Sequence, residues 1–292
     1  MKHIALKIDA DTYHGTLTGV PALITLLQKY DAQGTFFFSL GPDQSGKQKQ
    51  ANSLKRFYCL KTRLYGRLLP SPDIGKRCRE ILCQTHDAGF ETGIHAWNRV
   101  AWEERILEAD NAWSLEQINK AGSCFTALLS TAATAYAAAG WRSNRYALRQ
   151  TQRLALSYAS DCRGSHPFIP VIDGEIVACP QIPTTLPTLD EILSLEPGFS
   201  ADEAAERILK LSSAIPGDHG FNLRAELEGL VFSSTFERLL AGWKQAGFSL
   251  VALRDIRSQW ESAALPKHEI RFEEIPGRPG KRMIQGPTFP CP

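Results

Sequence analysis

The sequence predicts an α/β fold with a parallel sheet. Short apolar runs typical of strands alternate with amphipathic runs typical of helices as far as residue 253, and this alternation favours parallel strands joined by right-handed crossovers. Polar residues follow several of the apolar runs, which is where α/β barrels carry their sites. The chain has 292 residues, 43% of them apolar, so it is long enough to bury a full core.

Five apolar runs in the first half of the chain have the length of buried strands. They cover residues 3–8, 34–41, 90–95, 134–140 and 156–160. Between them, apolar residues recur at helical spacing. The helices are expected at residues 19–31, 74–88, 103–128 and 144–155.

In the second half, two helices begin with capping boxes, in which a Ser or Thr is followed three residues later by Glu. These begin at Thr188 and Ser200. A strand, a helix and a final strand follow at 221–226, 233–246 and 248–253. We expect one domain over 1–260, with a basic amphipathic insertion at about 47–79. The tail over 261–292 is rich in Pro and Gly and is expected to be irregular.

The composition excludes several classes of protein. The net charge is +2 and the seven cysteines contain no CxxC pair, so a disulfide framework is not expected and a reducing compartment is favoured. The N-terminus lacks the apolar stretch of a signal peptide. No run of about 18 apolar residues occurs that would span a membrane.

Two aspartates and a histidine follow predicted strands. Asp9 and Asp11 lie two residues apart, so on a regular strand they point the same way. One of two such carboxylates is held ionised by a cation while the other acts as a base; a pair of solvated turn residues is the competing interpretation. With His95 they offer the ligands of a divalent metal, although a lone histidine is more often a satisfied structural residue.

An arginine and a further aspartate follow two more strands. Arg142 in AAGWRS and Asp161 in SDCRG are expected on the same rim as the first three residues. An arginine that grips a carboxylate in a bidentate pair also orients it, so Arg142 and Asp161 form a supporting layer. A structural ion pair is the alternative.

Seven strings carry a family resemblance across residues 7–229, about three quarters of the chain. They are KIDADTYHG, TFFFSLGPD, GIHAW, AAGWR, YASDCRG, PQIPTTLPTLDEI and AELEG. With them the chain resembles the polysaccharide deacetylase (NodB-homology) family. Within that family it is most similar to the branch of 4-deoxy-4-formamido-L-arabinose-phosphoundecaprenol deformylases.

The resemblance implies a distorted (β/α) barrel with an incomplete ring of strands. It implies a metal-dependent amide hydrolase that removes a formyl or acetyl group from an undecaprenyl-phosphate-linked amino sugar, in lipopolysaccharide and lipid A modification. Carried over by motif, Asp9 is the general base, and Asp11 and His95 are ligands of a divalent metal. Arg142 orients Asp9, and Asp161 supports it. The metal lowers the pKa of a bound water, and Asp9 takes the proton of that water.

The sequence departs from the family pattern at two places. Arg99 and Arg224 stand where the family has histidines. Arginine stays protonated and offers a metal no lone pair, and a cation beside a metal repels it. We expect a weakened metal site with His14 as the candidate third ligand, or else a direct contact of both arginines with the substrate phosphate. Trp97 and Trp141 complete the expected substrate-binding set.

A basic segment suggests where the protein acts. Residues 47–79 contain ten Lys and Arg and one acid, and residues 54–69 form an amphipathic pattern on a helical wheel. This is typical of an interfacial helix on anionic lipid, with Phe57, Arg63, Leu64 and Leu68 as membrane residues; an ordinary surface helix is the alternative. We expect a peripheral protein at the cytoplasmic face of the bacterial inner membrane. No signature of nucleic-acid binding accompanies the segment, and no protein partner is predicted.

Three functions stay open at this point. The first is a deformylase or deacetylase of an undecaprenyl-phosphate-linked amino sugar. The second is a catalytically degenerate homologue that binds the phosphate of the same glycolipid, because Arg99 and Arg224 replace histidines. The third is a soluble sugar deacetylase.

Overall fold

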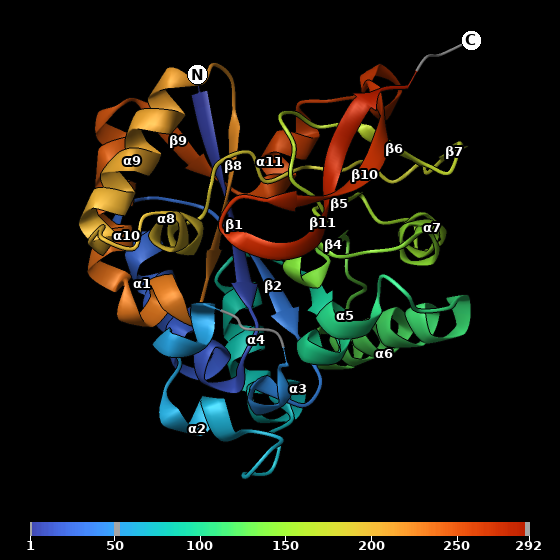
Figure 1. Cartoon of the computed structure of the whole chain (residues 1–292), viewed down its shortest axis with the longest axis horizontal. Coiled ribbons are helices and arrows are strands. Elements are labelled where there is room, and N and C mark those ends of the chain that lie inside the picture. The colour runs from blue at the N-terminus through green and yellow to red at the C-terminus, as the bar shows by residue number, and fades with distance from the viewer. Residues whose placement is uncertain (1, 50–52, 290–292) are drawn as a thin grey trace.

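A curled parallel sheet forms the centre of the computed structural model, which describes residues 2–49 and 53–289 (Figure 1). Within this part of the chain the sheet has seven strands in the order β5-β4-β3-β2-β1-β8, with β9 also paired to β1. The strands are β1 (Lys2–Ala10), β2 (Thr35–Ser39), β3 (Glu91–Ala96), β4 (Ala135–Tyr136), β5 (Tyr158–Ala159), β8 (His219–Arg224) and β9 (Phe248–Val251). All their pairings are parallel. The predicted distorted barrel is confirmed.

Helices cover the outside of this sheet. In Figure 1, α1, α9 and α10 lie beside β1 and β8, whereas α6 and α7 lie toward β4 and β5. The helices are α1 (Val20–Lys29), α2 (Leu60–Leu64), α3 (Ile74–Arg77), α4 (Arg79–Asp87), α5 (Arg99–Arg105), α6 (Asn111–Leu129), α7 (Arg145–Arg153), α8 (Leu189–Leu195), α9 (Ala201–Ala214), α10 (Ser233–Gln245) and α11 (Leu253–Ser258). Both predicted capping boxes are present.

Two predicted helices are each divided. The helix expected at 74–88 is interrupted at Cys78, which has non-helical backbone angles and separates α3 from α4. The helix expected at 103–128 is α5 followed by α6, and α6 begins anew where the Asp110 side chain accepts from the Trp113 N–H. An aspartate cap inside an amphipathic run is the signal that marks this second start.

The alternation of side chains along β1 separates two apolar layers. Ile4, Leu6 and Ile8 pack in the large core shared with the outer helices, whereas Ala5 belongs to a smaller cluster with Phe37. Since side chains on a strand alternate between faces, the odd-numbered residues of β1 line the inner face of the curled sheet. The candidate site lies at the end of that face.

Residues 267–288 of the C-terminal tail form regular strands, so the prediction of an irregular segment is wrong for this part; residues 290–292 lie outside the described residues. Residues 267–288 form a hairpin of β10 (Lys267–Ile275) and β11 (Arg278–Thr288), which joins β6 (Ile169–Ile172) and β7 (Glu175–Ile176) in a second sheet. Pro276 and Gly277 form its turn, with Gly277 at φ 79°. Of the Pro and Gly residues that suggested irregularity, Pro276 and Gly277 form the turn, and Pro279, Gly280, Gly286 and Pro287 lie within β11.

The basic segment is also different from its prediction. Instead of one helix over 54–69, the structure has a 3₁₀ turn at Ser53–Phe57, an extended residue at Cys59, and the short helix α2. The reason is that Tyr58 turns inward into the core while Gly66 takes φ 76°, a conformation that an α-helix excludes. Leu68 and Arg63 are exposed, but Leu64 is half-buried. In the described ranges, no helix is long and apolar enough to cross a bilayer.

Candidate active site

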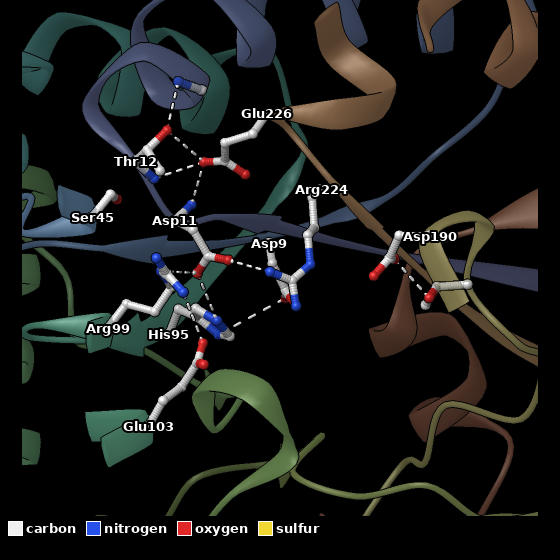
Figure 2. Close-up of polar contacts among 12 residues, drawn as sticks. Asp9, Asp11, Thr12, Ser45, His95, Arg99, Glu103, Asp190, Arg224 and Glu226 are labelled. Carbon is white, nitrogen blue, oxygen red and sulfur yellow. Dashed lines mark hydrogen bonds and ion pairs between the residues drawn. The ribbon is translucent and has the colours of Figure 1, made fainter. Parts of the chain in front are cut away.

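Strands β1, β3 and β8 of the one parallel sheet bring the predicted centre together. In the register of the sheet, Asp9 of β1 stands beside Arg224, the last residue of β8. His95 lies near the end of β3, and Asp11 follows β1 directly. Because the strands are parallel, their carboxyl ends meet at one edge, and Figure 2 shows Asp9, Asp11, His95 and Arg224 pointing toward one another.

Asp11 is surrounded by nitrogen donors. Its Oδ1 lies 3.1 Å from His95 Nε2 and 3.9 Å from Arg99 Nε, and its Oδ2 accepts from an Arg224 guanidinium nitrogen at 3.0 Å. All four side chains are buried. Burial alone raises the pKa of Asp11, but the charges of His95, Arg224 and Arg99 outweigh it and hold that pKa below its usual range.

Asp9 has a different environment. Its Oδ1 lies 3.8 Å from Lys7 Nζ and 3.8 Å from His95 Nδ1, and it accepts no hydrogen bond from the described residues. Lys7 is buried on the same face of β1 and donates to the Ser160 carbonyl oxygen at 3.0 Å. Burial lowers the pKa of His95, but Asp9 and Asp11 raise it by more. Asp9 Oδ1 is therefore a buried carboxylate oxygen that accepts no hydrogen bond from the described residues and lies close to Lys7 and His95.

Arg99 is fixed by its own partners. It begins α5, donates to Glu103 Oε1 at 2.9 Å and to Gln48 Oε1 at 3.3 Å, and is only 3% exposed. Glu103 is one turn further along α5, so the buried guanidinium carries its counter-ion on its own helix. This pairing explains how a cation is accommodated so close to Asp11.

The residues present do not fit the predicted divalent metal. Asp11 Oδ2 already accepts from Arg224, and the two guanidinium groups beside Asp11 would repel a second cation even though its Oδ1 has no hydrogen-bond partner among the described residues. No three His, Cys, Asp or Glu side chains gather as a metal site within residues 2–49 and 53–289. His14 lies beside Thr18 and lines a pocket with Phe57 and Glu226. The structure gives His14 no contact with Asp11 or His95 among the described residues, and its role as a third ligand stays a prediction.

Buried acids support the centre. Glu226 Oε1 accepts from the Asp11 N–H at 2.8 Å and from the Thr12 N–H at 2.6 Å, which fixes the loop that carries Asp11. Burial and the charge of Asp11 raise the pKa of Glu226 to about 7. Asp161 accepts from the Ala138 N–H at 2.7 Å, and burial raises its pKa to about 6.

The sequence reasoning missed Lys7, Glu103 and Glu226. A signal existed for Lys7, which is two residues before Asp9 and so shares its face of the strand. Glu226 stands in the AELEG string, whose position was noted although its first glutamate was not assigned a role. Glu103 carried no signal until Arg99 was known to be buried.

Other predicted site residues lie around the centre. Arg142 donates to the main-chain carbonyl oxygen of Glu103. The buried Trp141 ring lies 4.8 Å from the Arg278 guanidinium of β11 and 5.1 Å from that of Arg163. Trp97 is half-buried. The substrate contacts expected of Trp97, Trp141, Arg99 and Arg224, and the orienting role of Arg142, stay predictions.

Two curated relatives match nearly the whole chain. One, from Shewanella sediminis, is 34% identical over 289 residues, 95% of this chain and 92% of that protein. The other, from Wigglesworthia glossinidia brevipalpis, is 31% identical over 280 residues, 91% of this chain and 96% of that protein. Both are named probable 4-deoxy-4-formamido-L-arabinose-phosphoundecaprenol deformylase ArnD. No protein-family model matches the chain.

Solved structures share the fold at low identity. A polysaccharide deacetylase from Mycobacterium smegmatis, described as putative in its own name, superposes with a TM-score of 0.67 at 15% identity, over 94% of this chain and 96% of that one. A CE4 family pseudoenzyme from Bacillus anthracis superposes with a TM-score of 0.53 at 12% identity, over 88% and 66%. This fold thus occurs both in a protein described as a deacetylase and in one described as a pseudoenzyme. Because the two curated relatives are 34% and 31% identical to it over most of their length, the chain belongs to the ArnD deformylase family of hydrolases.

Proposed function

We propose that this protein hydrolyses the formamide of a 4-amino-4-deoxy-arabinose unit linked to undecaprenyl phosphate. Relatives named for that reaction are 31% and 34% identical over most of the chain. The observation that carries the proposal is Asp9, a buried carboxylate whose Oδ1 accepts from no described residue and lies between Lys7 and His95. It has the position and the free acceptor that a general base requires.

In the proposed reaction, water adds to the formyl carbon and the carbon–nitrogen bond breaks to give formate and the free amine. Asp9 takes the proton of the attacking water. His95, charged between two carboxylates, supplies the proton that the leaving nitrogen needs. Arg224 Nε has no partner among the described residues, so it supplies a donor for the developing oxyanion. Since the residues do not fit a divalent ion, no step is assigned to one.

A second candidate function is a catalytically inactive protein that binds the same glycolipid. The ion pair between Arg224 and Asp11 favours it, because Arg224 balances the charge of Asp11 when no substrate is bound. A soluble sugar deacetylase, the third possibility from the sequence, shares the chemistry of the first and differs from it in having no membrane step.

The proposed place of action is the cytoplasmic face of the inner membrane, at an anionic lipid surface. An undecaprenyl chain cannot leave the bilayer without a large hydrophobic cost, so the protein comes to the lipid. Leu60 and Leu68 support this proposal, since they are 68% and 74% exposed amid Lys61, Arg63 and Arg67.

The test is release of formate from a synthetic formamido-arabinose phosphoprenol, compared between the parent and Asp9→Asn. We expect turnover by the parent and a loss of about a hundredfold or more in the variant. Asp218→Asn is the matched control, because Asp218 pairs with His3 at the opposite end of β1. Binding of the glycolipid without turnover by the parent would establish the second candidate, and neither binding nor turnover would refute both.

A further inference from the structure

Two imidazole rings face each other between the loop before β6 and the C-terminal hairpin. His166 Nε2 lies 3.2 Å from His268 Nε2, the ring centres are 5.0 Å apart and the ring planes meet at 71°. His166 also lines a cavity of about 610 Å³ with Lys2 and His219, the first residues of β1 and β8. The pair therefore lies toward the amino ends of these strands, whereas Asp9 lies at the carboxyl end.

Neighbouring hydrogen bonds place the ring protons of both histidines. His268 Nδ1 lies 2.8 Å from the Gly286 carbonyl oxygen, which only accepts, so Nδ1 carries the proton and Nε2 the lone pair. Gln285 Oε1 accepts from the Ser165 N–H at 2.8 Å, which leaves the amide nitrogen of Gln285 3.1 Å from His166 Nε2. This nitrogen donates, so His166 Nε2 also carries a lone pair, and His166 Nδ1 donates to Ser165 Oγ at 2.8 Å.

Two lone pairs that face each other repel unless a proton or a metal ion lies between them. Two imidazole nitrogens bound to one tetrahedral Zn²⁺ are about 3.3 Å apart, and their ring centres are about 5.2 Å apart. The observed separations of 3.2 Å and 5.0 Å for His166 and His268 agree with this arrangement. The two Nε2 atoms thus already have the separation that a shared ion requires.

We propose that His166 and His268 bind a borderline divalent ion of the Zn²⁺, Ni²⁺ or Cu²⁺ class through their Nε2 atoms. Imidazole favours these ions, whereas Mg²⁺ and Ca²⁺ require oxygen ligands. A third His, Cys, Asp or Glu ligand is absent from the described ranges, so water completes the coordination. The hydrogen bonds from Nδ1 to Gly286 and Ser165 hold the rings as outer-shell contacts do in metal sites.

Metal binding would fasten the hairpin to the body of the protein. His268 belongs to β10, and His166 to the loop that follows β5. Further along the same hairpin, Arg278 reaches Asp190 and Glu191 near the candidate active site. The ion would replace the hydrogen bond from Gln285 to His166 with a coordinate bond, and would hold β10 against the loop that carries His166.

The test is calorimetric titration of Zn²⁺, and then Cu²⁺, into the full chain after treatment with chelator and desalting. We expect one ion per chain, and a loss of at least about tenfold in affinity in His166→Ala and in His268→Ala. His86→Ala is the control, since His86 is exposed and hydrogen-bonds to Thr92. Circular dichroism without metal checks that each variant is folded.

Two further variants make the result decisive. Gln285→Glu places a carboxylate beside His166 and is expected to tighten binding about tenfold. Asp11→Asn separates this site from the candidate active site and is expected to leave the affinity unchanged. The proposal is overturned if the parent binds neither ion, if both histidine variants bind as the parent does, or if Asp11→Asn abolishes binding. None of these outcomes depends on turnover of the glycolipid.

Discussion

At the scale of single residues, the centre is a balance of buried charges. Arg224 lies 3.0 Å from Asp11, at the position where the family pattern has a histidine. Removing one member of such a buried pair leaves an uncompensated charge, which costs about 3–5 kcal/mol. The guanidinium is therefore part of the folded centre, and a metal ion at Asp11 would have to displace it.

The first prediction concerns this exchange of cations. The double variant Arg99→His, Arg224→His removes both guanidinium groups from Asp11 and adds two imidazoles, so we expect it to bind Zn²⁺ at this centre where the parent does not. Calorimetry in a His166→Ala background isolates the centre from the pair of His166 and His268. Adding Asp11→Asn to the double variant is expected to abolish the new binding. Stoichiometric Zn²⁺ binding at Asp11 without the two histidines would contradict the prediction.

The second prediction concerns Glu228, whose side chain is fully buried and accepts from the Arg224 N–H at 2.8 Å. Burial raises its pKa from 4.5 to about 8. Between these values the folded state keeps a proton that the unfolded state releases, so the free energy of unfolding falls as the pH rises from about 4.5 to 8. One such group contributes a slope of about 1.4 kcal/mol per pH unit.

Glu228→Gln removes this contribution and keeps an acceptor for Arg224. Urea unfolding at pH values across that window should therefore show a shallower loss of stability in the variant than in the parent. Glu206→Gln, at an exposed position on α9, is the control and should retain the slope of the parent. Equal slopes in Glu228→Gln and the parent would show that Glu228 is ionised in the folded protein.

At the scale of elements, the C-terminal hairpin is the part that the sequence did not predict. Arg278 of β11 donates to Glu191 Oε1 at 2.7 Å and lies 2.8 Å from Asp190 Oδ2. Both acids belong to the first turn of α8, whose capping box was predicted. The capping box is local and can be read from four residues. The ion pair joins Glu191 and Arg278, which are 87 residues apart, and no local sequence pattern predicts it.

The third prediction follows from that contact. Arg278→Ala leaves Asp190 without its buried counter-ion and removes one of the two arginines beside Glu191, the other being Arg163 at 2.9 Å. We expect a loss of about 3 kcal/mol in the free energy of unfolding, measured by denaturant titration. Arg271→Ala, on the exposed side of β10, is the control and should change stability by less than about 0.5 kcal/mol. Matching stabilities of the two variants would mean that the hairpin is held by its strand pairing.

At the scale of the whole molecule, the order of the elements was predictable and the closing contacts were not. Asp9, Asp11 and His95 could be placed together because the carboxyl ends of parallel strands share one edge. The contact between Glu226 and Asp11 spans 215 residues, and only the closure of the curled sheet creates it. The same holds for His166 and His268, which are 102 residues apart.

The last prediction concerns how the whole molecule meets a membrane. Leu60 and Leu68 are exposed on a basic surface that includes Lys61, Arg63 and Arg67. Insertion of these leucines and the attraction of the cations to anionic lipid act together, with about 1 kcal/mol for each basic residue near the surface. We expect the protein to float with liposomes that contain anionic lipid, and less so at high salt, because salt screens the attraction.

Changing Leu60 and Leu68 to Asp removes the apolar contact and adds two charges that anionic lipid repels, so flotation should be lost. The control is Leu195→Asp, since Leu195 is 50% exposed at the end of α8, outside the basic segment. Loss of flotation in Leu195→Asp as well would point to general destabilisation rather than to this surface. If the parent itself stays with the soluble fraction while it still hydrolyses a short-chain substrate, the membrane step is wrong and the chemistry at Asp9 stands without it.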